Sequence, residues 1–381
     1  MLEKFLDAKP LYYDEIDYTR MPRVYKSIQE KLKLPKIIHL IGTNGKGTTG
    51  RFLAAALYAQ GHSVGHYSSP HIVEFNERIW LNGANAAYEL LESAHKELLA
   101  ILSREDADAL SYFEYATLLA ILLYKDCEYV VLEAGLGGEH DATAVFANIL
   151  TLITPIGKDH EAFLGDTIEK IATTKLNAIQ KNAILAKQVN PEVRAVANRI
   201  AVQNGVCVYE LQDFLKEHDY KRVEEISKKL NLSEYLEQNL QLAIAALNYL
   251  GVCYSADSFK ESRLFGRLSP LGENILIDVG HNVLAAQQIL QSLKSKKYVL
   301  VYNSYKDKNY REILTILRPI IERIEIIQVN DARIESTQTM QKVLVALGYE
   351  HHQFKEIKSD ANYLVFGSFS VVETFLKVYR G

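Results

Sequence analysis

A glycine-rich stretch, GTNGKGTT (residues 42–49), follows the apolar run KIIHLI and precedes a helical pattern. Where a strand turns into a helix in this way, the first backbone N–H groups of the helix form an anion site. Lys46 adds a cation for the β- and γ-phosphates of a nucleotide, and Thr48 offers a hydroxyl to Mg²⁺. The spelling departs from the common P-loop, G-x-x-x-x-G-K-[ST], because Leu40 and Gly47 stand at two of its fixed positions. The stretch therefore predicts a nucleotide-binding loop with a variant sequence motif.

Candidate metal ligands follow other apolar runs. Glu133 ends the run YVVLE just before a series of glycines, and Asp159 and His160 follow the run that ends in TPIG. Ser69, in the loop YSSPH, can add a hydroxyl ligand. The carboxyl ends of parallel strands meet at one edge of a sheet, so we expect these side chains to converge near Thr48. Such oxygen ligands beside a phosphate site are typical of Mg²⁺ binding.

The remaining candidates are polar or aromatic residues next to expected strand or helix ends. They are Asp278, His281 and Asn282 after an apolar run, Arg267 in the segment before it, Phe113 and Glu114 at the start of a helical pattern, and His71 in the loop YSSPH. An arginine in a linker can reach across a cleft between domains. We take His71, Phe113 and Glu114 as candidates for binding a second substrate.

The elements that must position these residues alternate along the chain. Apolar runs without polar alternation, typical of buried parallel strands, alternate with helical patterns. Expected strands are 36–42, 128–138 and 147–157 in the first part and 274–280, 297–303, 323–329 and 363–368 in the second. Expected helices are 47–60, 87–103, 114–125, 167–181, 191–204, 235–250 and 369–379. The polar segment 253–274 is expected to be a linker. With 381 residues, the chain is predicted to form two α/β domains, 1–257 and 258–381, the first a P-loop doubly wound domain with a mainly parallel sheet.

Composition narrows the class of protein. The net charge of −4 gives no bulk attraction to nucleic acid or to an anionic membrane, so we expect neither as a partner. Three scattered cysteines without a C-x-x-C pair indicate neither a disulfide framework nor a zinc site. The acidic N-terminus is not typical of a signal peptide, and no run approaches 18 apolar residues. We therefore expect a cytoplasmic protein.

Taken in order, the motifs resemble those of the Mur ligase superfamily, specifically folylpolyglutamate synthase and the bifunctional dihydrofolate synthase. The family's loop reads T-N-G-K-G-[ST], and YSSPH, FEY, LEAGLGG, DH, GR, D-x-x-H-N and LVFGSF follow in the family's order between residues 42 and 369. The resemblance implies an ATP-binding domain and a smaller Rossmann-like domain that acts in glutamate ligation. It also implies ATP- and Mg²⁺-dependent addition of L-glutamate to dihydropteroate or to folate glutamyl tails through an acyl phosphate.

The resemblance assigns roles to individual residues. It implies that the ATP phosphates are bound by Asn44, Gly45, Lys46, Gly47 and Thr48, and that a magnesium site for two ions is formed by Thr48, Ser69, Glu133 and His160. It implies that Asn239 contacts adenine and that Phe113 lies near the pterin. From the second domain, the nucleotide would be approached by Arg267, Asp278 and His281. Lys46, His281 and Lys175 are the expected catalytic residues. Lys175 occupies the place of a carbamylated lysine that helps to hold the second metal, but its neighbours, TTKLNAI, differ from the family's. Glu139 and His140 also depart from the family, which has an arginine and an apolar residue there.

Two other functions fit parts of the pattern. A Mur-type peptidoglycan ligase shares the superfamily, but only about 36 residues precede the loop strand here, where such enzymes have an additional domain. A regulatory P-loop ATPase shares the loop but has no need of DVGHN. The sequence leaves open the choice of acceptor, the length of the glutamate chain, carbamylation of Lys175 and the oligomeric state, for which we expect a monomer.

Overall fold

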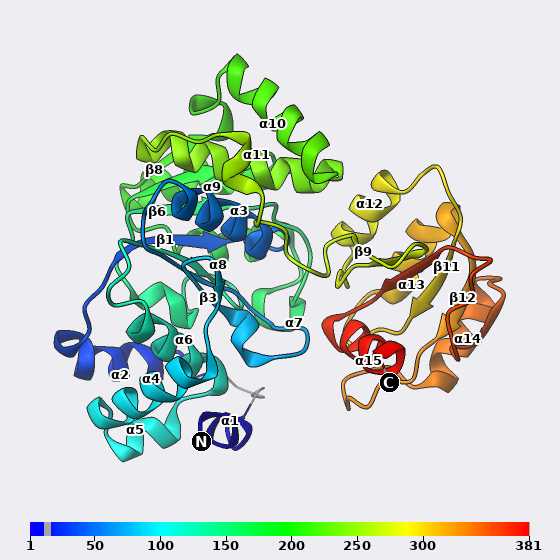
Figure 1. The fold of residues 1–381 in the computed structure, drawn as a ribbon, viewed down its shortest axis with the longest axis horizontal. Helices are drawn as coiled ribbons and strands as arrows, with labels where there is room; N and C mark the ends of the chain where they lie inside the picture. The colour runs from blue at the N-terminus through cyan, green and yellow to red at the C-terminus, as the bar shows by residue number, and fades with distance from the viewer. Residues whose placement is uncertain (11–16, 381) are drawn as a thin grey trace. The chain divides into compact units, whose positions relative to one another are not determined.

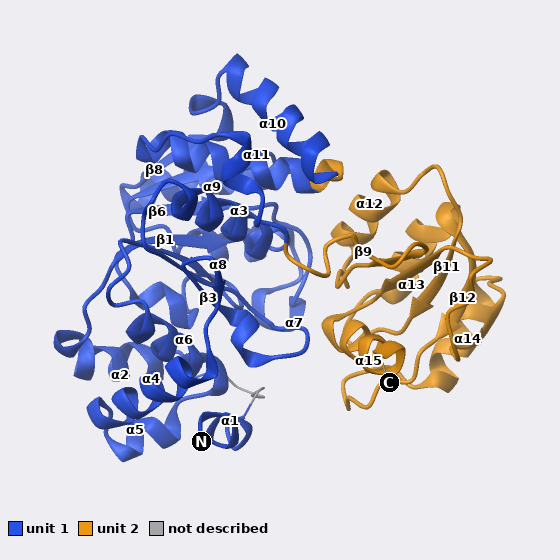
Figure 2. Cartoon of the chain, viewed as in Figure 1, with its two compact units in different colours: residues 1–231, 236–263 blue, residues 232–235, 264–381 orange. Residues whose placement is uncertain are grey.

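The computed structural model describes residues 1–10 and 17–380 and divides the chain into two compact units. Unit 1 comprises Met1–Asn231 and Leu236–Arg263, and unit 2 comprises Leu232–Tyr235 and Leu264–Gly381 (Figure 2). The expected boundary at residues 257/258 lies close to the break at Arg263. Helix α11 (Glu234–Leu250) contributes its first residues to unit 2 and the rest to unit 1.

Unit 1 is built on an eight-stranded sheet with the order β4-β3-β2-β5-β1-β6-β7-β8. Its strands are β1 (Lys36–Ile41), β2 (Val64–Tyr67), β3 (Ile79–Leu81), β4 (Ala84–Asn85), β5 (Tyr129–Glu133), β6 (Leu150–Ile153), β7 (Asn182–Leu185) and β8 (Cys207–Glu210). All neighbours from β2 to β8 pair in parallel, whereas β3 and β4 are antiparallel at one edge. The carboxyl ends of β5, β1 and β6 therefore lie side by side.

Helices cover both faces of this sheet (Figure 1). The helices of unit 1 are α1 (Leu2–Asp7), α2 (Arg20–Ile28), α3 (Lys46–Ala59), α4 (Tyr88–Ile101), α5 (Arg104–Ala109), α6 (Tyr112–Leu123), α7 (Glu161–Leu164), α8 (Ile168–Leu176), α9 (Glu192–Asn204), α10 (Glu217–Leu230) and most of α11, with short 3₁₀ turns η1 (Gln29–Lys31), η2 (Phe75–Arg78), η3 (Ala142–Val145), η4 (Leu211–Asp213) and η5 (Ala256–Phe259). On β5, Val130 and Leu132 belong to the core beneath α6, while Val131 faces Gly50 of α3. Successive side chains of a strand point to opposite faces, so an unbroken apolar run is what a doubly covered strand requires.

Unit 2 has a six-stranded sheet with the order β13-β12-β11-β14-β10-β9. Its elements are β9 (Ser269–Leu271), β10 (Ile275–Ile277), α12 (Val283–Ser292), β11 (Tyr298–Tyr302), α13 (Tyr310–Leu317), η6 (Arg318–Ile320), β12 (Ile321–Ile326), α14 (Thr337–Ala346), β13 (His351–Gln353), β14 (Tyr363–Phe366) and α15 (Phe369–Arg380). Every pairing is parallel except that of β9 with β10.

The prediction of an α/β protein with two mainly parallel sheets is confirmed, but several local expectations are wrong. The expected linker 253–274 contains η5 and the edge strand β9. The apolar runs expected to be strands up to residues 138 and 157 end as strands at Glu133 and Ile153, and loops follow them. Across residues 1–10 and 17–380, no helix combines the length and apolar character needed to cross a membrane.

Candidate active site

The loop between β1 and α3 has the tight geometry that its glycines allow. Gly45 has φ +92° and precedes the first residue of α3, Lys46. A Cβ atom on Gly42 would clash with the Thr154 hydroxyl, and one on Gly45 would clash with the Asn239 carboxamide. Asn239, predicted from the sequence to contact adenine, is therefore packed against the nucleotide loop.

Two lysines meet at one carbonyl of this loop. Lys46 Nζ donates to the carbonyl oxygens of Gly42 (3.2 Å) and Thr43 (3.3 Å), and Lys175 Nζ donates to the same Gly42 oxygen (3.0 Å). Lys46 Nζ also lies 3.9 Å from Glu133 Oε1, at the end of β5. Burial and the charge of Lys46 lower the pKa of Lys175 to about 7. The predicted catalytic lysines and the predicted metal-binding carboxylate are thus neighbours.

Thr48 has the environment of a ligand to an absent group. The residue is only 2% exposed, and its Oγ1 has no hydrogen-bond partner among residues 1–10 and 17–380. A buried hydroxyl is normally satisfied, so the Thr48 hydroxyl is available to an ion or a phosphate oxygen at the start of α3, as the sequence predicts. Glu133 Oε2 accepts from the backbone N–H of Ser69 at 3.3 Å, which brings a second predicted ligand to the same strand end.

His160 lies after β6 in a left-handed backbone conformation, with φ 52° and ψ 39°, and its Nε2 is 3.9 Å from Asp159 Oδ1. For a residue other than glycine this conformation is uncommon and is concentrated at functional sites. Within the described part of the chain, no three His, Cys, Asp or Glu side chains form a ready metal cluster. The predicted set has only two such residues, because its other donors are the hydroxyls of Thr48 and Ser69.

The predicted substrate-binding residues fall into different environments. Phe113 lies beside the glycine turn that follows Glu133, since a Cβ on Gly135 would come within 2.6 Å of its ring. His71 Nδ1 accepts from Arg78 Nε at 2.8 Å, and burial together with this guanidinium lowers the pKa of His71 to about 4. His71 is therefore a neutral acceptor at pH 7.

The Glu114 carboxylate is engaged in hydrogen bonds within the protein. Its Oε2 accepts from Arg20 Nε and from the backbone N–H of Ser111, both at 2.7 Å, and it forms the capping box of α6. These bonds stabilise the helix start next to Phe113, so a direct substrate contact of Glu114 stays a prediction that the geometry does not favour.

Three predicted residues lie in unit 2, and two of them, Arg267 and His281, contact the first residue of α15. His281 lies 6.3 Å from the ring of Tyr305 and 6.5 Å from that of Phe369, and the Arg267 guanidinium lies 5.4 Å from the Phe369 ring. Asp278 is buried, and its carboxylate accepts from Tyr235 Oη (2.9 Å) and from the N–H groups of Leu268 (2.9 Å) and Gly280 (2.8 Å).

Sequence reasoning missed residues that act by holding the candidates. Asp141 is buried and accepts from the N–H groups of Leu136 and Thr143, which fixes the glycine turn after β5. Arg78, the partner of His71, is also buried. Neither Asp141 nor Arg78 directly follows an expected strand or belongs to a recognisable motif spacing. Only their polarity within apolar surroundings could have identified them as functional residues.

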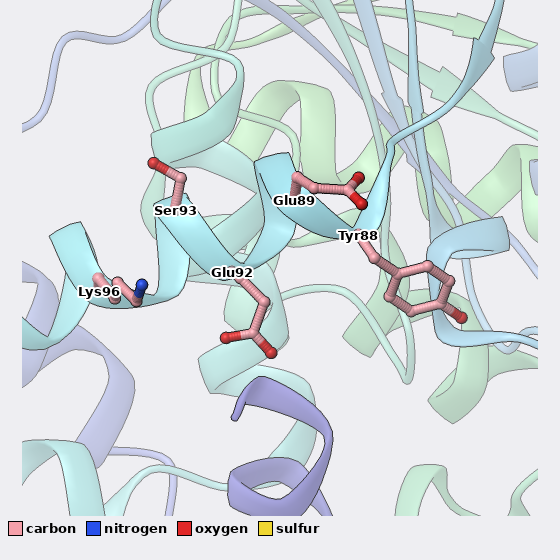
Figure 3. Close-up of a pocket in the computed structure, with 5 residues that line it drawn as sticks. All are labelled: Tyr88, Glu89, Glu92, Ser93 and Lys96. Atoms are coloured by element: carbon pink, nitrogen blue, oxygen red, sulfur yellow. The ribbon is translucent and has the colours of Figure 1, made fainter.

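A shallow hollow lies elsewhere in unit 1. Its lining side chains come from successive turns of α4 alone (Figure 3): Tyr88, Glu89, Glu92, Ser93 and Lys96. None of them is a predicted site residue. The chemistry predicted from the sequence lies instead at the strand ends.

Comparison with known proteins decides the family, although no family model matches the chain. The chain is 30% identical to the dihydrofolate synthase/folylpolyglutamate synthase of Haemophilus influenzae, over 93% of this chain and 92% of that protein. The chain belongs to the dihydrofolate synthase/folylpolyglutamate synthase family. It is therefore an ATP-dependent ligase, and the suspected resemblance to this family is confirmed.

Solved structures of this family agree with this assignment. The folylpolyglutamate synthetase of Helicobacter pylori is 37% identical with a TM-score of 0.80, and the match covers 100% of this chain and 98% of that one. Escherichia coli FolC in complex with DHPP and ADP has a TM-score of 0.82 at 24% identity, over 98% and 96% of the two chains. The latter likeness shows the shared fold.

Proposed function

We propose that this ligase joins L-glutamate to a pteroate-type acid, either dihydropteroate or a folate glutamyl tail, through an acyl phosphate. The observation that carries the proposal is the buried, unsatisfied Thr48 hydroxyl at the start of α3, beside Lys46 and Glu133. Complexes of similar proteins support it, since one structure contains DHPP and ADP and another, from Yersinia pestis, contains AMPPNP and a Mn ion.

The chemistry requires activation of the acid. A carboxylate is a poor electrophile towards an amine, so its oxygen first attacks the γ-phosphorus of ATP and ADP leaves. The amine of glutamate then attacks the acyl carbon, and phosphate leaves. Lys46 and the N–H groups at the start of α3 neutralise the repulsion between the anionic carboxylate and phosphate. The protein contributes positioning and charge stabilisation rather than a covalent intermediate.

The proposal includes bound magnesium. Thr48, Ser69, Glu133 and His160 would hold it, and the second of two ions would lie near Lys175. When bound, Mg²⁺ screens the charge of the phosphate oxygens during transfer. The orphan Thr48 hydroxyl and the Glu133 carboxylate fit this ion, which prefers oxygen ligands.

Further roles complete the proposed site. Asn239 contacts the adenine, while Arg267, Asp278 and His281 act on the nucleotide from unit 2. Since Asp278 already accepts three hydrogen bonds, its contact would use only the remaining lone pair. Phe113 packs near the pterin. We also propose a monomer located in the cytoplasm, and the elution volume in size-exclusion chromatography tests the monomer.

A coupled assay tests the function. Phosphate release should require MgATP, a pteroate-type acid and L-glutamate together, and dihydropteroate and tetrahydrofolate in separate reactions identify the acceptor. A regulatory ATPase would hydrolyse ATP without the acid and the amino acid. A peptidoglycan ligase would respond only to a UDP-linked peptide acid, so either result would overturn the proposal.

The low pKa of Lys175 predicts a pH-dependent stability. In the unfolded chain its pKa returns to 10.5, so between about pH 7 and 10.5 unfolding takes up a proton and native stability rises with pH. Lys175→Met removes this dependence. We therefore expect the variant's stability advantage over the wild type to be largest at or below pH 7 and to shrink by up to about 1.4 kcal/mol per pH unit above it.

Urea unfolding of both proteins at pH 6, 7.5 and 9 measures this difference, because all other titrating groups are common to the two chains. An advantage that does not change with pH would show that Lys175 keeps its ordinary pKa in the folded protein.

A further inference from the structure

Two half-exposed aromatic side chains from distant segments are in contact on the surface of unit 1, with their ring planes tilted. Tyr18 precedes α2, and His140 lies in the turn before η3; their ring centroids are 4.6 Å apart with a 40° tilt. Tyr18 is 47% exposed and the His140 side chain 48% exposed. His140 also stands where the sequence departs from the family pattern.

Both backbone segments are held firmly. On one side, the N–H of Glu139 donates to the carbonyl of Thr174 (2.9 Å), and Asn177 Nδ2 donates to Glu139 Oε2 (2.8 Å). Asp141, which follows His140, is buried and hydrogen-bonded. The His140 imidazole is therefore attached to a turn that has little freedom to move.

The Tyr18 segment is anchored in a similar way. Thr19 donates through both its N–H (2.9 Å) and its hydroxyl (2.7 Å) to Asp17 Oδ1, and Arg20 is bound to Glu114. Helix α2 packs against η3, which brings Tyr18 to His140. An aromatic pair fixed at both ends loses little conformational entropy when a ligand binds to it.

The segments that carry the pair adjoin the elements that carry Phe113. The turn that carries His140 begins with Gly135, against which the Phe113 ring packs, and η3 also packs against α6, the helix that carries Phe113. Glu139 places a carboxylate 4.0 Å from His140 Nε2. The surface thus offers π faces and, at their edge, an acceptor for ring N–H or amino groups.

We propose that Tyr18 and His140 form a stacking platform for the planar heteroaromatic ring of the acid substrate and that they help to determine which acids are accepted. This inference rests on the proposed function. A flat ring matches two aromatic faces that remain half exposed, because their burial against it would recover apolar area and stacking energy. An aliphatic or peptide-like acid would gain neither.

The experiment is isothermal titration of pteroic acid into the protein saturated with MgADP. Tyr18→Leu and His140→Leu should each raise the Kd for pteroic acid about tenfold, the scale of one lost stacking contact. Tyr18→Phe should bind like the wild type, since it keeps the ring. Tyr88→Leu is the matched control, because Tyr88 is 46% exposed but lies in the hollow on α4 (Figure 3). The Kd for ADP and the Tm should not change in any variant.

The possible outcomes distinguish the stacking platform from the ligase function. Wild-type affinity in both leucine variants, or equal weakening in Tyr18→Phe, would overturn the platform while leaving the ligase function standing. Equal weakening in Tyr88→Leu would show a non-specific surface effect and would also overturn it. A wild-type protein that binds MgADP but not pteroic acid would overturn the choice of acid substrate itself, and the platform with it.

Discussion

Lys46→Ala is expected to lower kcat for ATP-dependent ligation by about 10²–10³-fold, by analogy with the loss of one donor to a developing anion. The Lys46 amino group belongs to the first residue of α3, and it lies near the carbonyl oxygens of Gly42 and Thr43 and the carboxylate of Glu133. Because alanine is a good helix former at this first position of α3, the fold should be preserved. Phosphate release with all three substrates and urea unfolding measure the two effects.

Lys170→Ala is the control for this experiment. Lys170 lies in α8, has a 65% exposed side chain and pairs with Asp166 at 2.9 Å. An exposed pair of this kind contributes little, so turnover and stability should both match the wild type. Wild-type turnover in Lys46→Ala would remove the central role that we assign to this residue.

Gly45→Ala is expected to have the second large effect, a loss of about 10²-fold in kcat/KM from displacement of the nucleotide loop. A left-handed conformation costs a non-glycine residue about 1–2 kcal/mol. The added methyl group would also clash with Asn239, which is 5% exposed and has little room to withdraw, at a further cost of about 1–3 kcal/mol. ADP titration, steady-state kinetics and urea unfolding together record these losses.

Gly61→Ala separates the two costs. Gly61 has φ +89°, close to the +92° of Gly45, but a Cβ there would meet nothing within 4 Å. The control should therefore lose only the conformational term and keep its affinity for ADP. If both variants lose the same stability and bind ADP equally well, the contact between Asn239 and the loop has no role in nucleotide binding.

The fold could be predicted where one physical signal dominated. Mainly apolar runs without polar alternation predicted β1, β5 and β6, because strands covered on both faces bury nearly all of their side chains. Polar elements were missed for the converse reason. Helix α10 has buried Val223 and Ile226 but is otherwise mostly charged, and β9 contains a proline at the edge of its sheet, so neither carried a clear pattern.

The candidate site was predictable to the extent that strand ends define it. Lys46 and Glu133 were found this way, and the structure places them 3.9 Å apart. Contacts between distant segments could not be foreseen, since Asn239 meets Gly45 only through tertiary packing. Glu114 shows a second limit: the sequence could not reveal that this carboxylate also caps its own helix, and its contact with substrate stays a prediction. The functional roles of these residues remain predictions until the variants are measured.

Helix α11 has a consequence for dissecting the protein. Tyr235 packs against the hydrophobic core of unit 2 and donates to Asp278, although the rest of that helix belongs to unit 1. A fragment that starts at Leu264 would lose this aromatic side chain and leave a buried carboxylate short of one donor. We therefore expect a fragment that starts at Leu264 to be less stable than one to which a segment carrying residues 232–235 has been added.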